Sequence, residues 1–312
     1  MKSAIIGSFL FITIYNVMMI GPPGAGKTML AQRLATILPP LTLAESLETT
    51  RIYSSVGLLE RGRALLATRP VRTPHHTASG PALIGGGADA KPGELSLAHH
   101  GILFLDEFAE FPRHVLEMIR QPLEDGTVTV SRAKRSNVYP ANFMLVASCN
   151  PCPCGYYGCD RRRCRCTPGQ VERYLSRISG PLMDRIDIHI EVPPVTFSKL
   201  RSRRGELDSA TILGDVVKAR GVQAKRFGDG SPGAPGMTNS DMTHKQVQEY
   251  CELDEASEML LKQAMTEFGL SARAHDKILK VARTIADLAG CENIGAEHIA
   301  EAIGYRKLDR SL

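Results

Sequence analysis

Short apolar runs alternate with amphipathic stretches through the first two thirds of the chain. A helical pattern over 27–38 ends before the paired Pro39 and Pro40. Four runs are β-branched-rich, are bounded by turn residues and predict buried strands: NVMMI (16–20), ILFLD (102–106), FMLVASC (143–149) and IDIHIEV (186–192). Because helical patterns separate these distant strands, the sequence predicts an α/β fold with a largely parallel sheet.

Other segments have their own signatures. Residues 71–97 are rich in Gly, Pro and His and have weak periodicity, which predicts a long functional loop inserted into the core. Residues 127–140 alternate polar and apolar positions around a basic tip and predict a hairpin. Residues 228–240 have the composition of a linker, and the pattern after them is helical. In 274–289 the apolar positions share one face, and Gly290 suits the helix C-terminus.

These patterns predict the domain organisation. We expect an atypical N-terminal segment at 1–15, an α/β core at 16–200, a linker at 201–240 and a small helical domain at 241–312. A length of 312 residues suits about two domains.

Composition narrows the function classes only slightly. The net charge of +5 permits an anionic partner without requiring one. The apolar stretch 4–20 runs into a glycine-rich loop without a cleavage site, so we expect neither an export signal nor a membrane span, and a cytoplasmic location. In that compartment the eight cysteines are expected to be reduced, and five of them fall within 152–166. Such a cluster favours metal binding over disulfides.

The first chemical motif is GPPGAGKT at 21–28, which matches G-x-x-x-x-G-K-S/T between a strand and a helix. Its backbone N–H groups and the helix N-terminus can hold a polyphosphate. Lys27 would reach the β- and γ-phosphates, and the hydroxyl of Thr28 would bind Mg²⁺. The expected nucleotide-binding residues are Gly21, Pro22, Pro23, Gly24, Ala25, Gly26, Lys27, Thr28, Met29 and Asp106.

The second motif is GILFLDEF, in which a buried strand ends in Asp106 and Glu107. Asp106 can hold Mg²⁺ through water, and Glu107 can orient or deprotonate the attacking water. Together the two motifs predict ATP hydrolysis with Mg²⁺.

The cysteines form two C-x-C pairs, Cys152 with Cys154 and Cys164 with Cys166, separated by nine residues. Two such pairs can complete a tetrahedral Zn²⁺ site, although C-x₂-C spacing is the more usual signature. Basic residues in the same loop and at the hairpin tip suit a nucleic-acid backbone; the candidates are Lys134, Arg135, Arg161, Arg162 and Arg163. The paired histidines at 75–76 and 99–100 are interpreted as residues of the insertion and its surroundings, not as metal ligands.

Four long stretches carry a specific resemblance: GPPGAGKTMLAQRL, LAHHGILFLDEF, EDGTVTVSRAKRSNVYPANFMLVASCNPCPCG and YLSRISGPLMDRIDIHIEV. They resemble the magnesium-chelatase-like branch of the AAA+ ATPases and, within it, the YifB/ComM family, bacterial proteins linked to DNA branch migration during natural transformation. The resemblance extends from Asn16 to the C-terminus. It implies an AAA+ core followed by a helical lid.

The resemblance also assigns roles to polar residues. It makes Asn150 the sensor-1 residue, Arg185 the arginine finger that reaches a neighbouring subunit's nucleotide, and Arg273 the sensor-2 residue of the lid. A trans-acting arginine implies a homo-oligomeric ring, a hexamer by the family's habit. The partner would be single-stranded or branched DNA.

The sequence departs from this family at one point, and two alternative functions stay open. Members of this family carry a Lon-protease-like domain before the ATPase, whereas about fifteen residues precede the first strand here. A truncated chain that binds nucleotide without doing work is therefore one alternative. The other is the ATPase subunit of a complex that inserts metal into a tetrapyrrole.

Overall fold

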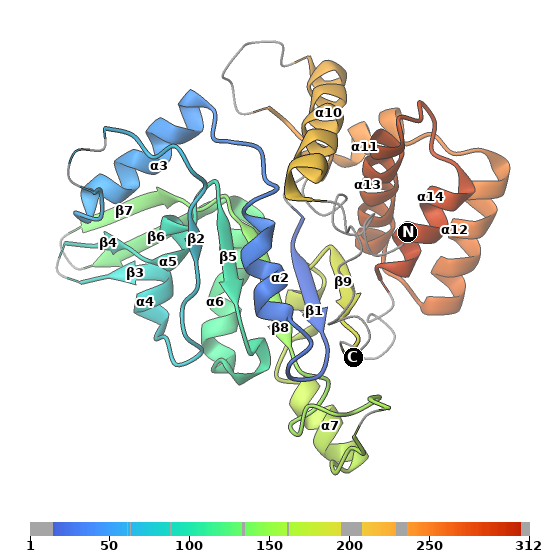
Figure 1. The fold of residues 1–312 in the computed structure, drawn as a ribbon, viewed down its shortest axis with the longest axis horizontal. Helices are drawn as coiled ribbons and strands as arrows, with labels where there is room; N and C mark the ends of the chain where they lie inside the picture. The colour runs from blue at the N-terminus through green and yellow to red at the C-terminus, as the bar shows by residue number, and fades with distance from the viewer. Residues whose placement is uncertain are drawn as a thin grey trace.

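Five parallel strands form the central sheet of the computed structural model (Figure 1). The structure describes residues 15–306 except 61, 63, 88, 133–134, 161, 195–207 and 229–235, so the expected N-terminal segment lies almost wholly outside the described residues. The strands, in spatial order, are β2 (Val71–Arg72), β5 (Ile102–Leu105), β8 (Met144–Cys149), β1 (Val17–Ile20) and β9 (Ile188–Glu191). The predicted parallel α/β fold is confirmed.

The three middle strands are buried along their whole length, which explains why each is a continuous apolar run. Every pairing in this sheet is parallel, so the carboxyl ends of the strands share one edge. That edge is where ligands bind in open α/β sheets.

Short helices connect the strands. The predicted helix over 27–38 is shorter than expected, because α2 ends at Leu34 and tight backbone turns from Thr36 and Ile37 replace its last turn. The other helices of this region are α3 (Leu43–Ser55), η1 (Phe108–Glu110), α6 (Arg113–Asp125), α7 (Pro168–Leu175) and α8 (Gly180–Met183); α2 itself spans Lys27–Leu34.

The insertion 71–97 has more structure than a loop. Leu83 and Leu95 are fully buried in the core of the sheet, which fixes two short helices in place. The insertion contains β2, α4 (Gly80–Ile84), β3 (Gly85–Gly86), β4 (Lys91–Pro92) and α5 (Glu94–Leu97). The hairpin prediction is confirmed by the antiparallel pair β6 (Thr127–Arg132) and β7 (Arg135–Pro140).

The last third is helical, as the pattern predicts. Its elements are α10 (Ser209–Phe227), η2 (Asn239–Asp241), α11 (His244–Tyr250), α12 (Glu255–Phe268), α13 (Ala272–Ala289) and α14 (Ala296–Gly304). Gly290 ends α13 with φ 71°, as expected of a glycine C-cap.

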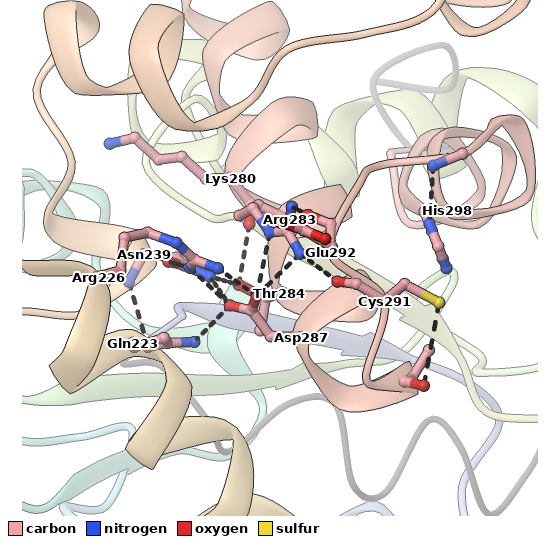
Figure 2. Close-up of polar contacts among 12 residues, drawn as sticks. Gln223, Arg226, Asn239, Lys280, Arg283, Thr284, Asp287, Cys291, Glu292 and His298 are labelled. Atoms are coloured by element: carbon pink, nitrogen blue, oxygen red, sulfur yellow. Dashed lines mark hydrogen bonds and ion pairs between the residues drawn. The ribbon is translucent and has the colours of Figure 1, made fainter.

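Helix α10 corrects the expectation of a linker over 201–240. Its N-terminus is capped by Asp208, whose carboxylate accepts from the Thr211 N–H at 2.8 Å. At its other end Arg226 donates to both oxygens of Asp287 on α13, at 2.5 and 2.8 Å (Figure 2). Asp287 also accepts from Asn239 at 2.8 Å and from Arg283 at 3.0 Å. This buried network holds α10 against the helical region.

The helices and the sheet share one hydrophobic cluster, which includes Val17 and Ile188 from strands and Ile278 and Ile285 from α13. An ion pair of 2.8 Å between Lys277 and Asp187 joins α13 to the segment before β9. Within the described residues, no helix is long and apolar enough to cross a membrane.

Candidate functional site: a phosphate loop, an acidic pair and a cysteine cluster

The glycine-rich segment turns sharply between β1 and α2. Gly24 and Gly26 have φ of 74° and 88°, in the left-handed region that glycine tolerates best. A Cβ on Gly21 would lie 2.3 Å from the carbonyl oxygen of Val192, so only glycine fits beside β9. Gly26 offers no side-chain cap to α2, which leaves the first N–H groups of the helix available to an anion.

Lys27 lies inside this loop and is only 8% exposed. Its Nζ donates to the carbonyl oxygens of Gly21 at 2.6 Å and Pro22 at 3.2 Å, and to Oδ1 of Asn150 at 3.1 Å. Burial lowers the pKa of Lys27, while the carboxylate of Asp106 opposes this shift. The three oxygens hold the ammonium at the centre of the loop, where the predicted polyphosphate would lie.

Thr28 and Asp106, both expected to bind Mg²⁺, lie in contact. The Thr28 hydroxyl donates to Asp106 Oδ2 at 2.8 Å, so two oxygens suited to Mg²⁺ lie side by side. The second carboxylate oxygen accepts a short hydrogen bond from Ser148, which the sequence interpretation missed. The signal for Ser148 was a hydroxyl in an otherwise apolar strand, next to the strand that ends at Asp106.

Strand register brings these residues together. Leu105 on β5 is paired with Ala147 on β8, and Ile20 on β1 with Cys149. One residue further on, all three strands reach the same edge, which carries Gly21, Asp106 and Asn150. The residues of the phosphate loop, the acidic pair and the sensor-1 candidate therefore form one site.

Glu107 follows Asp106 with φ 52°, a left-handed conformation that costs a non-glycine residue about 1–2 kcal/mol. Its carboxylate lies 3.0 Å from Nδ1 of His76, in the insertion, and its side chain is 52% exposed. The sequence interpretation gave His76 no role in the site. The contact joins residues 31 positions apart and has no local sequence signal.

Arg185 and Arg273 lie elsewhere. Both form ion pairs with Oε1 of Glu124, the Arg273 contact at 3.0 Å. The carbonyl oxygen of Arg185 accepts from the side chain of Asn16, which precedes β1, whereas the phosphate loop follows β1. The two arginines are therefore at the opposite edge of the sheet from the phosphate loop of the same chain. They line an open cleft of about 490 Å³ with Lys277.

The four cysteines of the two C-x-C pairs meet in space, with every pair of Sγ atoms within 4.8 Å. Helix α7, which follows this loop, projects at the foot of the view in Figure 1, away from hairpin β6–β7 on the left. The backbone of the β6–β7 hairpin and that of α7 therefore lie apart on one chain.

The structure describes only some of the residues predicted to contact DNA. Arg162 lies over the Tyr156 ring, 4.7 Å from its centroid, and donates to its hydroxyl at 3.2 Å. Arg163 is exposed. Lys134, Arg161 and the side chain of Arg135 lie outside the described residues.

Other predicted binding residues lie in the loop or just after it. Pro22 is buried, Pro23 is exposed at the start of the turn, and Ala25 is buried. Met29 is 54% exposed on the first turn of α2. Their part in nucleotide binding stays a prediction.

A parallel sheet with a phosphate loop after β1 and an acidic pair after β5 defines a P-loop nucleoside triphosphatase. Residues 10–200 match the family described as magnesium chelatase, subunit ChlI, and residues 206–306 match its C-terminal region. The chain belongs to this magnesium-chelatase-like AAA+ family. Family membership supports a nucleotide-binding core of the AAA+ ATPase type.

Individual relatives show which members of the family the chain is similar to. The chain is 45% identical over 300 residues to competence protein ComM of Haemophilus influenzae, covering 96% of this chain and 57% of ComM. It is 43% identical over 301 residues to the uncharacterized protein YifB of Escherichia coli, with the same coverage of the two chains. Magnesium-chelatase subunit ChlI of Bigelowiella natans is 24% identical over 258 residues, 72% of this chain and 65% of that protein. The chain thus spans somewhat more than half the length of ComM and YifB.

Proposed function

We propose that the protein hydrolyses ATP as a ring-forming AAA+ motor of the YifB/ComM type that remodels DNA. One observation carries the hydrolysis part: Lys27, Thr28, Asp106, Glu107 and Asn150 all come to one edge of the sheet. The similarity to a competence protein supports the choice of DNA over other substrates.

The residues at this edge fit MgATP. The loop's N–H groups and Lys27 bind the phosphates, and the oxygens of Thr28 and Asp106 are hard ligands for Mg²⁺. Mg²⁺, when bound, neutralises charge on the phosphates. Glu107 takes the proton of the attacking water, and the amide of Asn150 orients the γ-phosphate.

Arg185 and Arg273 act across a subunit interface in this proposal. Their place beside Glu124, at the edge opposite the phosphate loop, supports action on a neighbour's nucleotide. A head-to-tail contact that repeats this arrangement closes into a ring, which we propose is a hexamer.

Contact with the DNA backbone is proposed for Lys134, Arg135, Arg161, Arg162 and Arg163. Because the hairpin and the cysteine loop are apart on one chain, neighbouring subunits would combine them around a strand (Figure 1).

The first test is ATP hydrolysis by the 312-residue chain with and without branched DNA. We expect turnover that rises with DNA. Glu107→Gln should retain ATP binding and lose turnover by about 100-fold or more, whereas Lys27→Ala should lose binding. A folded chain without turnover under any condition would support the nucleotide-binding fragment instead.

A second candidate is the ATPase subunit of a metal-insertion complex, which the similarity to magnesium-chelatase subunit ChlI favours. Stimulation of turnover by branched DNA would separate the two, because a chelatase subunit has no reason to respond to DNA.

A further inference from the structure

We infer that Cys152, Cys154, Cys164 and Cys166 bind one structural Zn²⁺, and that this site braces the phosphate loop. The metal site stands independently of the ATPase function. Its effect on nucleotide binding rests on the proposed function.

The sulfur positions match a tetrahedral thiolate site. A Zn–S bond of about 2.3 Å places the sulfurs of a tetrahedron about 3.8 Å apart. Here Cys152 Sγ lies 3.3 Å from Cys154 Sγ and 3.8 Å from Cys164 Sγ, and the last two lie 3.6 Å apart. Cys166 completes the set, with all four sulfurs within 4.8 Å of one another.

Backbone donors aimed at sulfur are a second, independent observation. The N–H of Tyr157 donates to Cys152 Sγ at 3.3 Å, and the N–H of Cys166 donates to Cys164 Sγ at 3.4 Å. Such bonds stabilise thiolates, the form in which cysteine binds metal. On binding, each thiol releases its proton to solvent as its sulfur–metal bond forms.

Four thiolates in a tetrahedron suit zinc or iron, and a site with four protein ligands leaves no open position for catalysis. A structural role also fits the place of the loop in the fold. Cys152 is buried, whereas the other three ligands are partly exposed. A projecting segment with so little apolar burial needs a metal or another cross-link to hold one conformation.

The cysteine loop touches the nucleotide site directly. Cys152 follows the sensor-1 candidate Asn150 after a single residue. Gly155 has φ 81°, and a Cβ there would lie 2.7 Å from Cδ of Pro23 in the phosphate loop. The metal would therefore fix the backbone that packs against Pro23 and positions Asn150, whose amide oxygen accepts from Lys27. Loss of the metal would make the backbone segment beside Pro23 and Asn150 more mobile.

The test is the metal content of the purified chain, measured by inductively coupled plasma mass spectrometry after expression in zinc-supplemented medium. We expect about one Zn²⁺ per chain. The double variant Cys164→Ser with Cys166→Ser should lose it. Cys159→Ser is the matched control, since Cys159 lies in the same loop but outside the four-sulfur group of the described residues; this variant should keep its zinc.

A second measurement covers the case in which the double variant fails to fold. Wild-type protein is treated with a zinc-selective chelator in excess Mg²⁺ and then digested briefly. Cleavage should appear within 152–166, and affinity for a fluorescent ATP analogue should fall about fivefold. Metal-free wild type, iron in place of zinc, a disulfide within the cluster or equal zinc loss in Cys159→Ser would overturn the site. Zinc loss with unchanged ATP affinity would overturn only the bracing role.

Discussion

At the scale of single residues, most charged groups of the candidate site are held by several partners. Lys27 is surrounded by three oxygens, and Asp106 is held by Thr28 and Ser148. Glu107 differs, because it is half exposed, its backbone is left-handed and its partner is His76. The carboxylate that we propose faces the attacking water is therefore held by a residue outside the sheet.

His76→Ala should raise basal ATP turnover about threefold, because it removes a partly exposed ion-pair contact with Glu107 that is worth about 0.7 kcal/mol. Affinity for ATP should not change, since His76 touches Glu107 and not the phosphate loop in the described contacts. His75→Ala is the control, because the His75 ring nitrogen pairs with Thr77 at 2.9 Å. A fall in turnover would show instead that His76 supports the productive position of Glu107. Steady-state kinetics of the two variants and the wild type measures both turnover and the dependence on ATP concentration.

Acid should destabilise the fold through buried histidines. Burial lowers the pKa of His99 to about 4, aided by the charge of His100 and opposed by Glu48. The unfolded chain binds this proton near pH 6.5, so stability is present above that pH and falls between about pH 6.5 and 4. His189, whose pKa burial lowers to about 3, and Glu48, whose pKa is lowered chiefly by the His100 hydrogen bond, act in the same direction.

The His99 contribution should be about 2 kcal/mol between about pH 7 and 5. Urea unfolding at the two pH values measures it. His99→Gln should reduce the pH dependence by about that amount, and an unchanged slope would contradict the assignment to His99.

At the scale of helices and strands, the hydrophobic pattern predicted those elements whose signal lies within their own segment. The apolar runs ending at Ile20 and Cys149 became buried parallel strands, because such strands need no polar alternation. Helix α10 was missed, since its signal lies in long-range contacts such as Arg226 with Asp287, not in an apolar stripe. The contact of Glu107 with His76 was unpredictable for the same reason.

The α10 anchor gives a prediction about stability. Asp287→Asn should destabilise the fold by about 3–5 kcal/mol, because it removes a charge that two partly or fully buried arginines share. Asp215→Asn is the matched control on α10, where the ion pair with Lys218 is exposed; its effect should stay within about 0.5 kcal/mol. Thermal unfolding measures both, and equal effects would refute the anchoring role.

At the scale of the whole molecule, the family resemblance predicts that Arg185 acts on a neighbour's nucleotide, but it does not say where Arg185 and Arg273 lie in the fold. Arg185 and Arg273 are at one edge of the sheet and Lys27 at the other. Only strand order and register, which no local motif encodes, show this. In the proposed ring, a single chain therefore has half of each site, and a neighbour supplies the other half.

Mixing inactive subunits tests that requirement. Arg185→Ala leaves the phosphate loop intact, and Lys27→Ala leaves Arg185 intact, so each variant alone should lack turnover. In a random mixture about one quarter of the interfaces pair an intact loop with an intact arginine, and turnover should recover to about that fraction. A mixture of Lys27→Ala with Glu107→Gln is the control, because both changes inactivate the same half of the site and no interface is restored. Recovery only in the first mixture establishes that Arg185 acts on the neighbour's nucleotide, whereas no recovery would place its effect within its own chain.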